Sequence, residues 1–440
     1  MSLCSRTHGN HKILDIRIKT NYSVVILNAV KNLYYRRIIE EQPMKIINCI
    51  NALGEKTEIN IENGQNREID AGGMYALPGL VDLHVHFRDP GQTHKEDIFT
   101  GAKAAASGGV TSVIAMPNTA PPADNPEILS DIAARAKEAD IRIYQSACIT
   151  KQMKSEQLTD FDALAQAGAA AFSDDGLPVR SDELMKKALI KAAALGLPVL
   201  SHSEVLSLAE NGKVNEGEAS EKLGLKGMPK EAEYKAIERE IALCEETNCP
   251  LHICHVSTKE SIDLVREAKK KGIKITCETA PHYFTFTEKA VLSGDADYRM
   301  NPPLRTENDR QAVIEGLKDG TIDCIATDHA PHAPEEKDDF KKAPNGVIGL
   351  QTSLSASYTA LVKSGILTMR ELIKLMSENP AKIAKINREN DVILFDPNEK
   401  WTVEKEELAG KSKNTPFKGM ELFGKVKMTV CRGKIVYEEK

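Results

Sequence analysis

The segment Leu80–Gly91, which reads LVDLHVHFRDPG, constrains the fold of this chain more than any other. It begins as an apolar run of strand length and ends in an Asp-Pro-Gly turn. Because residues two apart on a β-strand point to the same face, His84 and His86 would project together, with Arg88 following on that side. Two convergent imidazoles form half of a typical zinc site. The alternative is a buried strand whose histidines are satisfied by ordinary hydrogen bonds.

Strands and helices alternate through the middle of the chain. Short apolar runs predict eight strands, at Leu80–Phe87, Thr111–Met116, Arg142–Ile149, Ala169–Ser173, Pro198–Ser201, Pro250–Val256, Lys274–Thr279 and Asp323–Thr327. Helical patterns lie between them, at Lys95–Ser107, Pro126–Ala139, Asp182–Leu195, Glu231–Cys244, Lys259–Lys271 and Glu307–Leu317. Such repeated units predict an α/β fold, a closed (β/α)₈ TIM-like barrel. An open doubly wound sheet is the alternative, but no GxGxxG follows the first strand.

Both ends of the chain have a different pattern. Short β-like segments with Gly and Asn turns occur between Met44 and Ala76, and similar segments return at Asp391–Phe395, Trp401–Val403, Gly424–Cys431 and Lys434–Tyr437. We therefore expect a small β-sandwich module formed from both ends, with residues 44–78 and 386–440 as its parts and the barrel at 79–385. Residues 1–43 are expected to be a non-native or disordered extension, because the cleaner pattern begins at Met44.

Composition limits the classes of function. With 440 residues the chain can form one large domain and a smaller module. A net charge of −6 argues against a nucleic-acid or membrane-surface partner, and no run is apolar enough to span a bilayer. The nine scattered cysteines include no CxxC pair, which is typical of reduced thiols in a cytoplasmic protein. A small-molecule substrate, including an anionic one, fits these properties.

Polar residues of metal-ligand type stand where the predicted strands end. They are His84 and His86 after the first strand, Asp174 and Asp175 after the fourth, His202 after the fifth, His255 after the sixth and Asp328 after the eighth. The carboxyl ends of barrel strands form one rim, so we expect these side chains to converge. Imidazoles and carboxylates suit zinc or another borderline divalent ion, and two ions could share a bridging carboxylate. Asp175 is the candidate bridge and Asp174 its rival, since strand alternation lets only one face inward.

This set of residues predicts metal-assisted hydrolysis of an amide-like bond. A divalent ion lowers the pKa of bound water towards neutrality, and Asp328 suits the roles of ligand and proton shuttle. Arg88 adds a bidentate cation, with a structural ion pair as the alternative.

Two further features suit a substrate site. Asn118 and Asn301 can each donate to and accept from a planar amide or urea, although either could be an ordinary turn asparagine. The charged, proline-rich segment 330–346 is either a substrate-covering loop, with His332 facing the ligand, or a plain solvated connection.

The chain resembles the amidohydrolase superfamily and, within it, the class I dihydroorotase family. The motifs that carry the resemblance are VDLHVHFRDPG (81–91), AMPNTAPP (115–122), FSDDG (172–176), SHSE (201–204), HVS (255–257), APHYF (280–284), MNPPLR (300–305) and ATDHAPH (326–332). The resemblance implies a metal-dependent enzyme that reversibly cyclises N-carbamoyl-L-aspartate to dihydroorotate in pyrimidine biosynthesis. It also implies one or two Zn²⁺ ions per subunit, a homodimer and association with an aspartate carbamoyltransferase.

The resemblance implies a role for each residue by its position in the motifs. The ligands would be His84, His86 and Asp328 for the first metal, His202 and His255 for the second, and Asp175 for both. The substrate carboxylate would be held by Arg88, Asn118 and His332, and the ring by Asn301 and the backbone of Asn345 and Gly346. Asp328 would be the general acid/base.

Two departures and three alternatives accompany the resemblance. Many relatives bridge their metals with a carboxylated lysine, but residues 169–176 contain no lysine, which agrees with class I dihydroorotase and counts against dihydropyrimidinase or hydantoinase. Asn345 stands where we expect an apolar residue. Allantoinase is a further alternative. An inactive scaffold would be expected to have lost metal ligands, and this chain retains every expected one.

Overall fold

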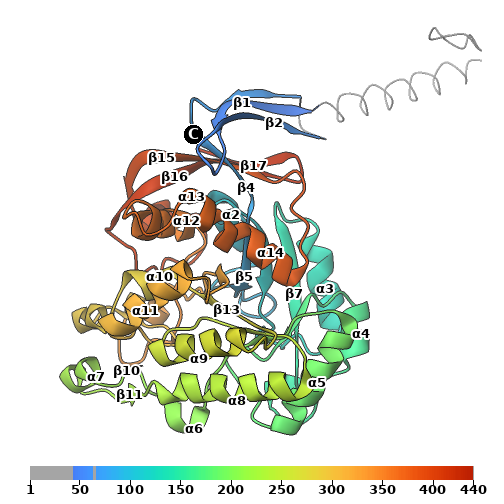
Figure 1. Cartoon of the computed structure of the whole chain (residues 1–440), viewed down its shortest axis with the longest axis vertical. Coiled ribbons are helices and arrows are strands. Elements are labelled where there is room, and N and C mark those ends of the chain that lie inside the picture. The colour runs from blue at the N-terminus through green and yellow to red at the C-terminus, as the bar shows by residue number, and fades with distance from the viewer. Residues whose placement is uncertain (1–42, 63–65, 440) are drawn as a thin grey trace, which may run out of the picture.

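The computed structural model describes residues 43–62 and 66–439 of the chain, and a closed barrel of parallel strands forms its centre (Figure 1). Two four-stranded sheets build the barrel, in the orders β5-β6-β7-β8 and β9-β12-β13-β14. Bridges between Phe172 and Val199 and between Val85 and His329 join the two sheets at both seams. The strands are β5 (Leu80–Val85), β6 (Val110–Ala115), β7 (Arg142–Cys148), β8 (Ala171–Ser173), β9 (Leu200–Ser201), β12 (Leu251–Ile253), β13 (Ile275–Thr279) and β14 (Cys324–Ile325). The predicted (β/α)₈ barrel is confirmed.

Helices connect the strands and cover the barrel. The predicted helices appear as α2 (Ile98–Ser107), α3 (Pro126–Ala136), α5 (Asp182–Leu195), α8 (Glu231–Thr247), α9 (Lys259–Lys270) and α11 (Glu307–Lys318). Local chemistry sets their ends: in α5 the Ser181 side chain accepts the amide of Leu184, and Gly196 ends the helix with φ at +68°. Shorter helices are α4 (Phe161–Gln166), α6 (Leu206–Ala209), α7 (Glu218–Leu223), α10 (Pro281–Thr285), α12 (Ser353–Ser357), α13 (Met369–Ile373) and α14 (Asn379–Ala384). A small pair of strands, β10 (Val214–Asn215) and β11 (Gly227–Met228), lies in the β9–α8 connection.

The two ends of the described chain meet in one seven-stranded sheet above the barrel (Figure 1). Its order is β17-β16-β15-β4-β1-β2, with β3 paired to β1. The strands are β1 (Met44–Ile50), β2 (Lys56–Ile61), β3 (Glu68–Asp70), β4 (Tyr75–Pro78), β15 (Val392–Thr402), β16 (Glu421–Cys431) and β17 (Lys434–Glu438). Residues 1–42 of the predicted extension lie outside the described residues.

The sheet of this module carries a core on each side. Met44 and Ile46 of β1 belong to the same buried cluster as Leu394 of β15 and Met428 of β16, so the two halves of the module pack together. Phe395 belongs instead to the main core of the barrel and its helices. Separate strands were expected at Asp391–Phe395 and Trp401–Val403, and this was wrong. They form one strand, β15, whose pairing with β16 shifts register between Asp396 and Lys400, which accommodates the polar residues between the two apolar runs.

An apolar cluster fills the barrel interior below the rim. Leu83, Ile114, Leu200 and Cys324 come from strands around the whole barrel, so they can meet only inside it. Ala381 of α14 belongs to the same cluster and covers one end of the barrel. The polar side chains must therefore gather at the opposite end, where the strands finish.

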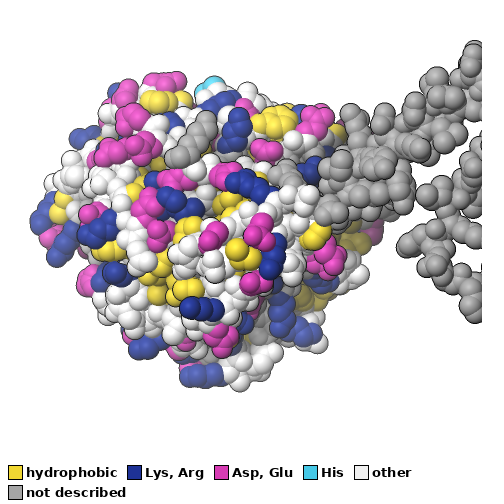
Figure 2. Space-filling view, turned by 90° about the horizontal axis from the view of Figure 1, so that it is seen from above, with side chains coloured by type: hydrophobic (Ala, Val, Ile, Leu, Met, Phe, Trp, Pro, Cys, Tyr) yellow, Lys and Arg dark blue, Asp and Glu magenta, His cyan; other side chains and the backbone are white. Residues whose placement is uncertain are grey.

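The outer surface is mixed in charge. On the face shown in Figure 2, Lys and Arg side chains are interspersed with Asp and Glu side chains and with scattered apolar residues. Within residues 43–62 and 66–439, no helix has both the length and the apolar character needed to cross a membrane.

Candidate metal centre

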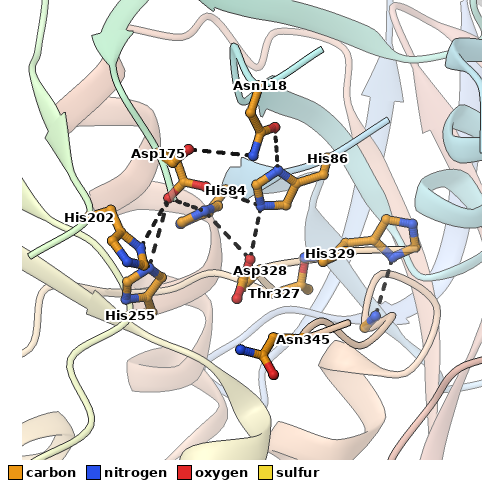
Figure 3. A network of polar contacts seen from close by, with 12 residues as sticks. His84, His86, Asn118, Asp175, His202, His255, Thr327, Asp328, His329 and Asn345 are labelled. Carbon is orange, nitrogen blue, oxygen red and sulfur yellow. Dashed lines mark hydrogen bonds and ion pairs between the residues drawn. The ribbon is translucent and has the colours of Figure 1, made fainter. Parts of the chain in front are cut away.

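Six side chains from both halves of the barrel converge at the carboxyl ends of its strands (Figure 3). Nε2 of His84 lies 3.2 Å from Oδ1 of Asp175, and Nε2 of His86 lies 3.1 Å from Oδ1 of Asp328. The remaining members, His202 and His255, face each other with Nδ1 of the first 3.0 Å from Nε2 of the second. The structure thus brings together all the side chains expected to bind metal.

Asp175 occupies the centre of this group. Its Oδ1 lies 3.6 Å from Nδ1 of His202 and 3.9 Å from Nε2 of His255, while its Oδ2 lies 3.5 Å from Nε2 of His86. With His84 also in contact, one carboxylate touches four imidazoles from both halves of the barrel. This placement suits a carboxylate that bridges two ions.

Asp174 is directed away from the centre. Its carboxylate accepts hydrogen bonds from the amides of Ile149 and Thr150 and from the Thr150 hydroxyl. Burial raises the pKa of Asp174, against these hydrogen bonds, to about 7. The choice that strand alternation left open is therefore decided in favour of Asp175 as the inward residue.

Two buried atoms of the centre need a further partner. Within the described part of the chain, Nε2 of His84 and Oδ1 of Asp175 have no hydrogen-bond partner, although burial makes an unsatisfied polar atom costly. Two sets of ligand atoms each lie within 4.8 Å of one another: His84 with Asp175 and His255, and His84 with His86 and Asp328. Nitrogen and oxygen donors grouped in this way fit a divalent ion of the zinc type.

The protonation states of the side chains agree with a cation site. Burial alone would lower the pKa of His84, but the charge of Asp175 raises it well above its ordinary value. Burial likewise opposes ionisation of Asp175, yet His84 and His202 hold its pKa well below the usual range. The pKa of Asp328 is also lowered, by His84 and His86 against burial. A proton on His84 thus balances the ionised carboxylates, and a bound metal ion would replace that proton.

Three of the imidazoles have a hydrogen-bond acceptor behind them. A proton on the supported ring nitrogen leaves the opposite nitrogen with its lone pair facing the centre. The pairs, each at 2.9 Å, are His84 Nδ1 with Glu278 Oε1, His86 Nδ1 with Asn118 Oδ1, and His202 Nε2 with Glu204 Oε2. Sequence reasoning assigned no role to Glu204 or Glu278. For Glu278, the available indication of a role was that an acidic residue lies inside the buried strand β13.

Glu278 is itself held by a histidine outside the centre. Its Oε2 lies 3.1 Å from Nε2 of His252, whose Nδ1 lies 2.8 Å from Oγ1 of Thr276. Burial favours the neutral carboxyl, but the hydrogen bonds to His252 and His84 lower the pKa of Glu278 to about 2. A buried, ionised carboxylate therefore supports His84.

Arg88 and His332 both have backbone or charge contacts with the segment that follows strand β14. Strand β5 ends at Val85 and Arg88 has φ at +59°, so the turn, and not strand alternation, directs its side chain. Nε of Arg88 donates to the carbonyl of Pro331 at 3.2 Å. Burial and the Arg88 charge lower the pKa of His332 to about 3, so its imidazole is neutral.

The groups expected to contact a ring at Asn345 and Gly346 already have partners in the protein. The carbonyl of Asn345 accepts from Nε2 of His332 at 2.9 Å, and the amide of Gly346 donates to the Arg299 carbonyl at 2.9 Å. Gly346 has φ at +136°, and a Cβ there would lie 2.8 Å from Cβ of Ala330, so only glycine fits. Ring contacts by these two residues stay a prediction.

The segment 330–346 is fastened to its surroundings. Nζ of Lys337 donates to the carbonyls of Ala296, Arg299 and Pro344, at 3.1, 3.3 and 2.9 Å. Nε2 of His332 donates to the carbonyl of Asn345 at 2.9 Å. Much of this segment is thus held beside the centre by its own hydrogen bonds.

Comparisons with known proteins agree with this geometry. Residues 73–261 match a family model described as Dihydro-orotase-like. The chain is 48% identical over 416 residues to a dihydroorotase of Geobacter metallireducens, covering 90% of this chain and 98% of that protein. A dihydroorotase of Acetivibrio thermocellus is 47% identical over 392 residues, covering 87% and 92%.

Solved structures of related enzymes share the fold. An L-hydantoinase (dihydropyrimidinase) from Arthrobacter aurescens superposes with a TM-score of 0.80 at 25% identity, covering 90% of this chain and 96% of that one. A dihydropyrimidinase from Brevibacillus agri gives a TM-score of 0.77, also at 25% identity.

Proposed function

We propose a metal-assisted mechanism for this chain on the premise that it belongs to the dihydroorotase family and is a cyclic amidohydrolase, one that interconverts N-carbamoyl-L-aspartate and dihydroorotate in pyrimidine biosynthesis. The observation that carries the mechanism is the convergence of four imidazoles and two carboxylates around Asp175 (Figure 3).

Zn²⁺ is the ion we propose, because imidazole nitrogen and carboxylate oxygen donors fit its preferences. His84, His86 and Asp328 would hold one ion, His202 and His255 a second, and Asp175 would touch both. An ion bound there supplies Lewis acidity, which polarises a carbonyl and makes water more acidic.

Asp328 would transfer the proton. Its Oδ1 faces His86 and His84, and its side chain, at 10%, is the most exposed of the six converging side chains, which suits a group that contacts substrate. In hydrolysis Asp328 takes a proton from the attacking water as the water oxygen bonds to the ring carbonyl carbon. It then returns that proton to the ring nitrogen as the carbon–nitrogen bond breaks. Ring closure follows the same path in reverse.

Arg88 would recognise the substrate carboxylate. Only its Nε makes a hydrogen bond among the described residues, so the two terminal guanidinium nitrogens can bind a carboxylate side by side. Asn118 and His332 would lie beside that carboxylate, and Asn301 beside the ring. A dihydropyrimidine without a carboxylate would leave the Arg88 charge unpaired. The homodimer and the carbamoyltransferase association stay predictions.

A steady-state assay of dihydroorotate, hydantoin and dihydrouracil hydrolysis tests the function, with metal content determined on the same sample. We expect turnover of dihydroorotate with bound zinc and little turnover of the other two rings. Preferential turnover of hydantoin, or full activity in a protein freed of metal, would contradict the proposal.

A further inference from the structure

One oxygen atom of Glu204 joins His202 of the metal centre to Asn301, the residue proposed to lie beside the ring. Oε2 of Glu204 lies 2.9 Å from Nε2 of His202 and 2.8 Å from Nδ2 of Asn301. The Glu204 side chain is only 11% exposed, so both contacts are largely shielded from water. Residues 204 and 301 are far apart in the chain and meet only in the folded barrel.

The contact with Glu204 fixes the orientation of His202. Its Nε2 is committed to the carboxylate, so Nδ1 is the nitrogen directed at His255 and Asp175, at 3.0 and 3.6 Å. The other ligand histidines with a known support, His84 and His86, present Nε2 instead. Without Glu204 nothing among these contacts would select the Nδ1 orientation of His202.

The same contact fixes the side-chain amide of Asn301. Its nitrogen faces the carboxylate, because a flipped amide would place Oδ1 against the negative Oε2 of Glu204. Oδ1 of Asn301 is buried and, among the described residues, has no hydrogen-bond partner. A buried acceptor without a donor is costly, and an N–H group of a bound ring would satisfy it.

We propose that Glu204 is a positioning residue that orients both the metal ligand His202 and the side-chain amide of Asn301, whose Oδ1 would accept a ring N–H. This inference rests on the proposed function, since it assigns the ring pocket to a cyclic amide. It predicts that Glu204 and Asn301 act as one unit on substrate binding. It also predicts that Glu204 alone affects the metal.

A double-mutant cycle tests the coupling. Glu204→Ala, Asn301→Ala and the double variant are compared with the wild type for the KM and kcat of dihydroorotate hydrolysis and for zinc affinity by chelator competition. We expect each single change to raise KM about fivefold or more, and the second change to add little to the first. Zinc affinity should fall about 10- to 100-fold in Glu204→Ala and stay unchanged in Asn301→Ala.

Two further variants allow the proposal to be tested if Glu204→Ala folds poorly. Glu204→Gln retains an oxygen that can accept from Asn301 but removes the charge behind His202, so KM should stay within about twofold while zinc affinity falls. The control is Glu240→Gln, which alters another buried carboxylate. Glu240 accepts from the hydroxyls of Ser201 and Ser203 on either side of His202, and its change should leave KM and zinc affinity unchanged.

Multiplicative effects of the two single changes on KM, or wild-type zinc affinity in both Glu204 variants, would overturn the coupling. Failure of the proposed function looks different, because the zinc-loaded wild type itself would then not hydrolyse dihydroorotate.

Discussion

Glu278 accepts a hydrogen bond from Nδ1 of His84 at 2.9 Å and holds His252 with its other oxygen at 3.1 Å. All three side chains are almost fully buried. A ligand at the rim is thus supported from the interior of the barrel, and this support sets which nitrogen of His84 is free to bind metal.

Glu278→Gln should weaken zinc binding, because a neutral amide no longer favours the Nδ1–H form of His84. We expect an affinity loss of about 10- to 100-fold, measured by chelator competition. His252→Gln, which removes only the brace behind Glu278, should give a smaller loss. Equal zinc affinity in wild type and Glu278→Gln would show that His84 needs no such support.

Asp328→Asn should abolish most turnover, since an amide cannot carry the transferred proton. The expected fall in kcat is about 10²- to 10⁴-fold, measured with dihydroorotate at saturating zinc. The matched control is Asp174→Asn, another buried acid of the barrel rim, which accepts from Thr150 and faces away from the centre. Near-normal kcat in Asp328→Asn would remove that residue from proton transfer.

Arg88→Met should raise the KM for dihydroorotate while zinc content stays normal. Hydrogen bonds to a charged group contribute roughly 1.5–3 kcal/mol, so the rise should be about 10- to 100-fold. Dihydrouracil, which lacks the carboxylate, serves as the control substrate, and its weak turnover should change little. An unaltered KM for dihydroorotate would assign Arg88 to a structural role.

Lys337 should make stability depend on pH. Burial, opposed by the charge of Asp297, lowers the pKa of Lys337 to about 7, against about 10.4 for an unfolded lysine. Between these values the unfolded chain holds a proton that the folded chain does not, so the contribution of Lys337 to stability rises with pH and is lost as pH falls through 7.

Urea unfolding at pH 7 and pH 9 checks this expectation. The quantity to compare is the difference in unfolding free energy between the wild type and Lys337→Met. This difference should increase from pH 7 to pH 9, by at most about 1.4 kcal/mol per pH unit. Lys341→Met alters an exposed lysine of the same segment and should show no such trend. A constant difference would mean that Lys337 stays charged in the folded protein.

The alternation of apolar runs with helical patterns was enough to predict the barrel, because that pattern follows directly from burial of each strand. Polar residues at the strand ends were enough to identify the six side chains that converge at the rim, because the carboxyl ends of barrel strands lie together. Strand alternation alone could not separate Asp174 from Asp175, since strand β8 ends at Ser173 and period-two alternation no longer applies beyond it. The family resemblance favoured Asp175, and the contacts of Asp174 with Thr150 agree with that choice.

Other features depend on contacts between distant parts of the chain. Arg88 was expected on the side of the histidines through strand alternation, but the strand ends at Val85 and a left-handed turn places Arg88 instead. Glu204 lies within a recognised motif, yet its link to Asn301 spans 97 residues and leaves no periodic trace in the sequence. The partners of Gly346 are likewise visible only after folding.

The two seams of the barrel, at Phe172–Val199 and Val85–His329, are each made by a single bridge between its four-stranded halves. His84, His86 and Asp175 belong to one half, and His202, His255 and Asp328 to the other. Any ion coordinated by residues of both groups is a cross-link between the halves at the rim. Metal loading would therefore also protect the seam amides from hydrogen exchange, and stripping the ions would let the barrel open there first.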